Sequence, residues 1–159
     1  MGRYLTAVVC LNGHMVTDSL ESAPAVASAH CSECGAKTAT RCSHCNENIR
    51  GHYQVDGVFT TRRAPVRKFC HACGKAYPWT EARLTAAREY ADEIDALSSD
   101  EKEVLKKSLD ELIKDSPQTN VAGVRFKKLM AKAGKESAAA LRDIVVDVVS
   151  ETAKKAMGL

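Results

Sequence analysis

The sequence predicts an α+β protein, in which an N-terminal part made of short β-hairpins is followed by an α-helical C-terminal region of about four helices. Two observations support this. All seven cysteines lie between Cys10 and Cys73, where short apolar runs alternate with turn residues. After Trp79 the chain has no cysteine, and Ala, Leu, Lys and Glu recur at helical spacing. The predicted domains are therefore residues 1–79 and 80–159.

The N-terminal cysteines occur in three Cys-x2-Cys pairs, and a Cys-x3-His pair precedes them. Each pair can place two donor atoms on one tight turn, and structural zinc takes four nitrogen or sulfur ligands in a tetrahedron. The four pairs therefore predict a double zinc ribbon with two Zn²⁺ per chain. The predicted ligands are Cys10, His14, Cys31, Cys34, Cys42, Cys45, Cys70 and Cys73.

The order of the pairs favours two consecutive ribbons. Gly35 and Gly74 directly follow the second and fourth pairs, whereas no glycine follows the first or the third. This repeat favours a site made by the first and second pairs and a site made by the third and fourth. A cross-braced arrangement, first with third and second with fourth, stays open because residues 35–41 can span roughly 3.3 Å each.

Other uses of the cysteines are less consistent with the sequence. No signal peptide precedes them, so we expect free thiols in a reducing, cytoplasmic location rather than disulfides. A thioredoxin-like pair would need a βαβ unit, and none is indicated. Iron–sulfur ligation by the all-cysteine pairs stays open. No apolar run reaches the roughly 18 residues that span a bilayer, so no membrane span is expected.

The strands of the first domain are predicted from turn residues. Residues 3–9 and 15–18 can pair across the Asn12-Gly13 turn. Residues 37–41 read as a short strand between the ribbons, and residues 53–59 read as a hairpin with Asp56-Gly57 at its turn.

Four helices are predicted in the second domain: 81–97, 99–114, 121–133 and 136–157. Thr80 is the expected N-cap of the first, and Ser98 with Glu101 forms a capping box for the second. Gly134 is the expected stop of the third. The residues expected on the inner faces of these three are Leu84, Ala87, Ala91, Ile94, Leu97, Leu105, Leu109, Leu112, Phe126, Leu129, Met130 and Ala133.

The last predicted helix, residues 136–157, is apolar around most of its circumference. Its apolar residues are Leu141, Ile144, Val145, Val146, Val148 and Val149. Such a helix is usually buried, but three small helices would leave Val146 and Val149 facing outward. We therefore expect a protein partner or self-association through this helix. A simple core helix and a membrane-surface helix are the alternatives.

The overall charge does not indicate an anionic partner, because the formal +3 falls to zero when seven thiolates and two Zn²⁺ are included. Local charge is more informative, since basic residues mixed with Tyr53, Phe59 and Phe69 are typical of nucleic-acid-binding ribbons. The alternative is that these residues offset the thiolates of the second site. The candidate anion or nucleic-acid contacts are Arg50, Arg62, Arg63, Arg67, Lys68 and Lys75.

Several segments together resemble a family of uncharacterised bacterial proteins. These are Cys10–His14, Cys31–Gly35, Cys42–Cys45, Ile49–Gly51, Phe69–Lys75, Pro78–Thr80, Arg125–Lys128 and Val148–Lys155. That family is similar in pairing a double zinc ribbon with a helical tail, and the resemblance covers nearly the whole chain. It implies a bacterial, cytoplasmic, zinc-containing protein and implies no activity.

The sequence is best interpreted as a non-enzymatic, zinc-binding interaction module. With every cysteine assigned to a closed metal site, no open coordination position is left for catalysis. Paired carboxylates, a phosphate-binding loop and a catalytic triad are not recognisable elsewhere. The alternative is a nucleic-acid-binding protein that uses the basic loop of the second ribbon.

Overall fold

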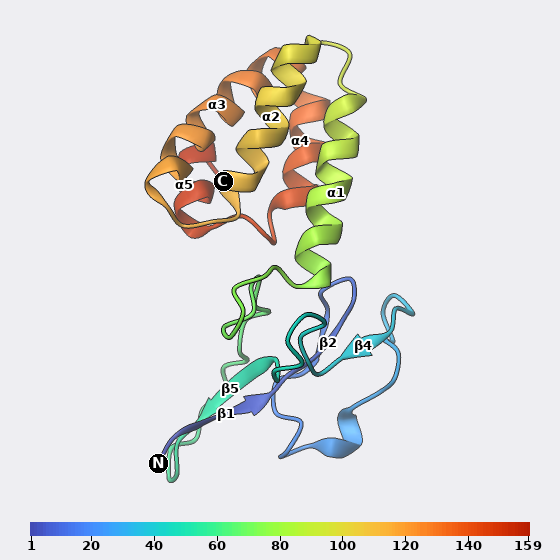
Figure 1. The fold of residues 1–159 in the computed structure, drawn as a ribbon, viewed down its shortest axis with the longest axis vertical. Coiled ribbons are helices and arrows are strands. Elements are labelled where there is room, and N and C mark those ends of the chain that lie inside the picture. Colours follow the sequence, from blue (N-terminus) through green and yellow to red (C-terminus); the bar gives the residue numbers. More distant parts are fainter. The chain divides into compact units, whose positions relative to one another are not determined.

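The computed structural model describes residues 1–159, and the chain divides into two compact units, Met1–Glu81 and Ala82–Leu159. The first unit contains all five strands, and the second is helical (Figure 1). The division falls inside the first helix, α1 (Pro78–Asp92). The predicted α+β class is confirmed, with five α-helices rather than about four.

One two-stranded sheet joins distant parts of the first unit. Strand β1 (Arg3–Thr6) pairs antiparallel with β5 (Arg50–Gln54), so that Tyr4 lies opposite Tyr53. The predicted hairpin within residues 53–59 is therefore wrong. Asp56-Gly57 does form a turn, but the strand before it, β5, pairs with β1 and not with the residues that follow the turn. The ring centroids of Tyr4 and Tyr53 lie 4.8 Å apart across the two paired strands.

The other sheet has three strands in the order β3-β2-β4. Strands β2 (Val8–Cys10) and β3 (Met15–Thr17) form a shorter hairpin than predicted, because residues 3–6 of the predicted strand pair with β5 instead. Its turn is closed by a hydrogen bond from the N–H of Gly13 to the carbonyl of Cys10 at 2.8 Å. Strand β4 (Thr38–Ala39) pairs with the other edge of β2. A short 3₁₀ helix, η1 (Pro24–Val26), lies in the loop between β3 and β4. Strand β2 therefore lies at the centre of this sheet and carries Cys10 at its end.

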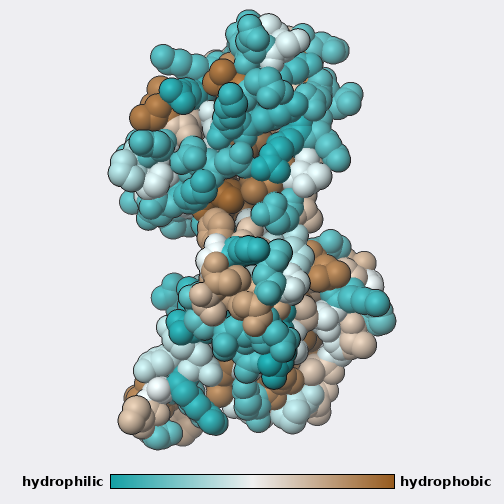
Figure 2. Space-filling view, viewed as in Figure 1, coloured by the Kyte–Doolittle hydropathy of each residue, from teal (hydrophilic) through white to brown (hydrophobic).

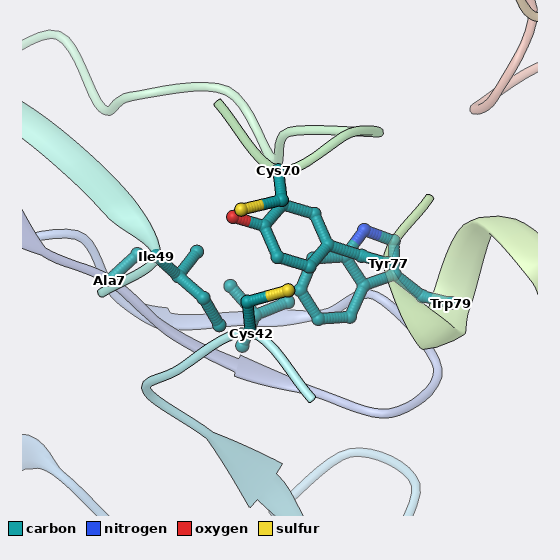
Figure 3. Close-up of a cluster of buried hydrophobic side chains, with 7 residues drawn as sticks. Ala7, Cys42, Ile49, Cys70, Tyr77 and Trp79 are labelled. Carbon is teal, nitrogen blue, oxygen red and sulfur yellow. The ribbon is translucent and has the colours of Figure 1, made fainter. Parts of the chain in front are cut away.

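The core of the first unit is small and contains sulfur. Tyr77 and Trp79 stack with their ring centroids 4.6 Å apart, and Cys42, Cys70 and Ile49 pack around them (Figure 3). The indole N–H of Trp79 donates to the carbonyl of Arg67 at 2.8 Å. Because two cysteines belong to this core, its packing and the arrangement of the thiols depend on each other.

In the second unit, α1 is followed by α2 (Ser99–Leu112), α3 (Pro117–Ala133), α4 (Lys135–Val145) and α5 (Glu151–Met157). The capping box of Ser98 and Glu101 is confirmed, and Gly134 ends α3 as predicted. Every residue expected on the inner faces of the first two helices is buried, as are Phe126 and Met130 of α3. The predicted end of the first helix at residue 97 is wrong, because α1 ends at Asp92 and Ile94 and Leu97 are buried in the loop that follows. Leu129 and Ala133 are only half-buried.

Two helix starts differ from the prediction. Helix α1 begins at Pro78, and the Thr80 hydroxyl donates to the carbonyl of Lys68 at 2.9 Å instead of capping the helix. Helix α3 begins at Pro117 rather than at residue 121. Proline is favoured at the first position of a helix, where its missing N–H leaves no donor unpaired. These prolines therefore start helices that the prediction began later.

The predicted single helix over residues 136–157 is wrong, because the chain forms α4 and α5 with a break between them. Ser150 starts α5: its hydroxyl accepts a hydrogen bond from the N–H of Ala153, and its own N–H donates to the carbonyl of Leu112 at 2.8 Å. The break turns Val148 and Val149 inward, where each is 3% exposed. The expectation that Val149 faces outward is therefore also wrong.

The surface of the helical unit agrees with this burial. On the face seen in Figure 2 it presents mainly hydrophilic side chains with scattered apolar ones. None of the helices is both long enough and apolar enough to cross a membrane.

Candidate metal centres

Three of the predicted pairs form turns with the same backbone hydrogen bonds, which we call knuckles 31–34, 42–45 and 70–73. In knuckle 31–34 the N–H of Cys31 donates to the carbonyl of Ala36 at 2.8 Å, and the N–H of Gly35 donates to the carbonyl of Cys31 at 2.9 Å. The other two knuckles repeat both bonds at the same distances. A single isolated bridge closes each one, such as that between Phe69 and Ala76.

The residue after the second cysteine of each knuckle has a left-handed conformation. The φ angles are 71° at Gly35 and Gly74 and 61° at Asn46, the only residue other than glycine in the chain with positive φ. Asparagine tolerates this region better than most residues. Knuckle 42–45 therefore forms the same turn as the other two, although no glycine follows Cys45.

The Cys-x3-His pair forms a tighter turn at the end of β2. The N–H of Cys10 donates to the carbonyl of His14 at 3.0 Å, and the N–H of His14 donates back to Cys10 Sγ at 3.2 Å. The ring nitrogen that lies near the cysteines is His14 Nδ1, at 3.5 Å from Cys10 Sγ and 3.7 Å from Cys31 Sγ.

The eight predicted ligands gather into two clusters. Cluster 1 contains Cys10, His14, Cys31 and Cys34, and cluster 2 contains Cys42, Cys45, Cys70 and Cys73. In each cluster the donor atoms all lie within 4.8 Å of one another. This is the consecutive pairing of ribbons, and the cross-braced arrangement is wrong.

The distances between donor atoms fit the coordination shell of one ion. Around a tetrahedral ion with bonds of about 2.3 Å to sulfur, two sulfur atoms lie roughly 3.8 Å apart, and sulfur and nitrogen lie roughly 3.5 Å apart. Cluster 2 has sulfur separations of 3.8 Å (Cys42–Cys73) and 3.6 Å (Cys45–Cys70). Cluster 1 has 3.7 Å between Cys10 and Cys34. Each cluster could therefore hold one metal ion.

Electrostatics also favour a cation at both clusters. The N–H of Ala36 and the amide of Asn12 donate to the Cys34 sulfur and lower its pKa to about 6, whereas burial raises the pKa of Cys10. Thiolates this close repel one another, so without a cation some of them must keep their protons. A divalent ion removes this conflict and releases the protons on binding.

The same contrast occurs in cluster 2. Burial by itself would raise the pKa of Cys70, but backbone N–H groups of Cys73 and Ala72 lower it to about 6. The N–H of Glu47 favours the Cys45 thiolate, yet burial and the sulfur of Cys70 raise the pKa of Cys45 to about 12. Backbone donors therefore stabilise thiolates here, but they do not ionise the whole cluster.

Two aromatic residues, to which the sequence assigned no role at the metal sites, link the clusters. The Tyr77 hydroxyl lies beside Cys70 Sγ of cluster 2 (Figure 3), and burial raises its pKa. The Trp79 side chain lies against the backbone of Gly13, in the turn that carries His14 of cluster 1. The only signal in the sequence for this role was the position of the two residues, shortly after the last knuckle.

The six basic candidates do not form one site. Arg50 and Arg67 line a surface hollow of about 260 Å³, together with Phe69. Arg62, Arg63 and Lys75 are exposed outside it. The carbonyl of Lys68 accepts hydrogen bonds from the Tyr77 N–H and the Thr80 hydroxyl, so the backbone beside the hollow is fixed.

The fold and its two clusters define an α+β protein with two candidate metal centres in one small unit and a helical second unit. The chain belongs to the bacterial family described as "Uncharacterized protein conserved in bacteria (DUF2321)", whose match covers residues 3–157. No match was found among curated proteins or among solved structures.

Proposed function

We propose that each cluster binds one Zn²⁺ and that the chain is a non-enzymatic interaction module whose binding surface is held in shape by these ions. The observation that carries the proposal is that all four donor positions of each tetrahedron come from the protein. Zinc is the ion of choice because four cysteines, or three cysteines with one histidine, are typical ligand sets of structural zinc. In cluster 1 the ion would be held through His14 Nδ1.

A structural role for zinc follows from the closed ligand sets. Catalytic zinc sites keep one position for water or substrate, and here the four protein donors would fill the tetrahedron. With zinc bound, cluster 1 would carry a formal charge of −1 and cluster 2 a charge of −2. The seven cysteines form no disulfide, which supports a reducing compartment, and we propose the cytoplasm.

Elemental analysis of the purified chain tests the metal assignment. We expect close to two zinc ions per chain and little iron. Matched variants then assign the ligands: His14→Ala should lose one zinc, whereas His44→Ala should keep both, because His44 lies in knuckle 42–45 but belongs to neither cluster. One metal per chain, or an iron chromophore, would contradict the proposal.

Cysteine labelling tests the independence of the clusters. Cys42→Ser should expose Cys45, Cys70 and Cys73 to alkylation while Cys31 stays protected in cluster 1. Mapping of the labelled cysteines by mass spectrometry reads out both sites in one experiment. Loss of protection throughout the chain would mean that the clusters form one cooperative centre.

Nucleic-acid binding by the second ribbon is the second candidate function. It is favoured by unpaired charge, because no carboxylate forms a salt bridge with Arg50, Arg62, Arg63, Arg67 or Lys75. Binding through phosphates predicts an affinity that falls with salt, linearly on logarithmic axes. If no oligonucleotide binds at low salt, this candidate is excluded and the zinc proposal is unaffected.

A protein partner, or self-association through residues 136–157, is a further proposal. The sequence suggested this contact because Val149 was expected on the surface, but Val149 is buried in the core. The exposed positions of this segment are mostly charged, such as Glu136, Asp143 and Asp147. A contact here would be polar and sensitive to salt. Light scattering at low and high ionic strength tests it, and a monomer under both conditions excludes self-association.

A further inference from the structure

Two adjoining hollows lie on the first unit beside cluster 2. Each has a volume of about 260 Å³, and they share Tyr4, Arg50 and His71. Tyr4, from β1, is 42% exposed, whereas Tyr77 is 1% exposed. The wall of the first hollow is made by Tyr4, Arg50, Arg67, Phe69, His71 and Tyr77. Aromatic and cationic side chains from three separate parts of the chain thus meet around one opening.

The positive charge at the first hollow is available to a ligand. Neither Arg50 nor Arg67 pairs with a carboxylate, and the first hollow has no acidic residue in its wall. The adjoining hollow contains one, Glu47. The Arg50 guanidinium lies over the Tyr4 ring at 4.5 Å from its centroid, which orients it at the opening without neutralising it.

The wall is also built on a fixed backbone. The carbonyl of Arg67 accepts the indole N–H of Trp79 at 2.8 Å, and Phe69 is paired with Ala76 in the bridge that closes knuckle 70–73. Phe69 directly precedes Cys70, a residue of cluster 2. A metal ion in cluster 2 would thus fix the backbone of Phe69, so that little backbone freedom is lost when a ligand binds.

We propose that the first hollow is a binding site for single-stranded nucleic acid. One unpaired base stacks on Phe69, and Arg50 and Arg67 contact the phosphates on either side. The inference rests on the nucleic-acid candidate above and assigns it to this hollow rather than to the loop that contains Arg62 and Arg63. A single strand is required because the bases of a duplex are already stacked and cannot enter. An acidic peptide could pair with the two arginines, but it would have no group to stack on the ring of Phe69.

The test uses the full-length, zinc-loaded chain and fluorescein-labelled oligothymidylate, with fluorescence anisotropy measured over a series of salt concentrations. Arg50→Gln with Arg67→Gln should weaken binding and reduce the slope of log affinity against log salt by about 1.4, since each phosphate contact to a single strand contributes about 0.7. The matched control, Arg62→Gln with Arg63→Gln, removes the same charge outside the hollow and should leave the slope unchanged.

Phe69→Leu tests stacking separately from charge. It should weaken binding by roughly 5- to 150-fold, the usual contribution of one stacked base, without changing the salt slope. Zinc content is measured for every variant. If Phe69→Leu loses zinc, the assignment to the hollow is judged from the two double arginine variants alone. A duplex of the same length, inorganic phosphate and polyglutamate serve as competitors and should all compete poorly.

The possible failures can be told apart. If no oligonucleotide binds at low salt, nucleic-acid binding itself is wrong. If binding is lost with the Arg62 and Arg63 control but kept with the Arg50 and Arg67 variant, only the assignment to the hollow is wrong. If polyglutamate or the duplex competes as well as the single strand, the site recognises charge alone and the stacking role of Phe69 is wrong.

Discussion

The two units have similar lengths but different cores. In Met1–Glu81 the buried core has one aromatic pair, Tyr77 and Trp79, packed against cysteine side chains and a few aliphatic ones. In Ala82–Leu159 the core contains one aromatic residue, Phe126, and is otherwise made mainly of leucine, valine, alanine and methionine side chains, with contributions from all five helices. A unit with so little apolar surface needs cross-links to be stable, whereas the helical unit can rely on packing. The stability of the first unit should therefore depend on metal and that of the second should not.

The largest expected effect is that of a strong chelator on the first unit. In zinc-finger peptides the binding of structural zinc contributes roughly 10–16 kcal/mol per site to the free energy of folding. The small apolar core of the first unit cannot supply this stability without the metal. Trp79 is the only tryptophan of the chain and lies in the first unit. Its emission should therefore shift to the red on chelation, while the helical circular dichroism signal changes little. Collapse of both signals together would show that the helical unit also depends on metal.

The candidate metal ligands could be predicted from the sequence because their chemistry depends on local spacing. A Cys-x2-Cys turn has the same shape in all three knuckles, and Asn46 takes the place of glycine in one of them. The pairing of β1 with β5 could not be predicted, because it joins residues about 50 positions apart and only the short apolar runs were visible. The role of Trp79 depends on the same long-range packing.

In the helical unit, the inner faces of α1 and α2 were predictable from periodicity, but the break after Val145 was not. The run Val145–Val149 fits a helix as well as it fits a turn. Burial of Val148 and Val149, together with the hydrogen bonds of Ser150, decides in favour of the turn. The only local signal was Ser150 followed by Glu151, a good N-cap in the middle of an apolar helix.

The second largest effect is expected from Val149→Asp, which challenges the packing of the helical unit. Val149 is 3% exposed, so a carboxyl group there must be protonated to stay buried, at a cost of about 4 kcal/mol at neutral pH. Thermal unfolding followed by circular dichroism should show a large loss of stability with zinc content unchanged. Val146→Asp is the matched control and should cost less, because Val146 is half-buried. Equal effects would contradict the inward position of Val149.

A smaller effect is expected where α3 crosses α5. A Cβ atom on Gly123 would overlap the Cβ of Ala156, so Gly123→Ala must push the helices apart. We expect a net cost of about 1–3 kcal/mol, although alanine is the better helix former. Adding Ala156→Gly should restore most of the loss. If the double variant is no more stable than Gly123→Ala, the helices do not touch closely at this point.

The smallest effect concerns the knuckles and asks whether backbone conformation limits metal binding in the first unit. An alanine at positive φ costs roughly 1–2 kcal/mol, so Gly35→Ala and Gly74→Ala should weaken zinc binding at clusters 1 and 2 by about 5- to 30-fold. Asn46→Gly should change affinity by no more than about twofold, because asparagine already tolerates this conformation and a more flexible chain offsets the relief.

Competition with a chromophoric chelator measures the zinc affinity of both clusters in the same titration. Each variant changes one cluster, so the affinity of the other cluster serves as an internal reference. If Asn46→Gly instead tightens cluster 2 several-fold, the knuckle 42–45 is strained in the native chain. One residue would then limit the affinity of cluster 2, even though its sulfur separations of 3.6 and 3.8 Å already match those around a tetrahedral ion.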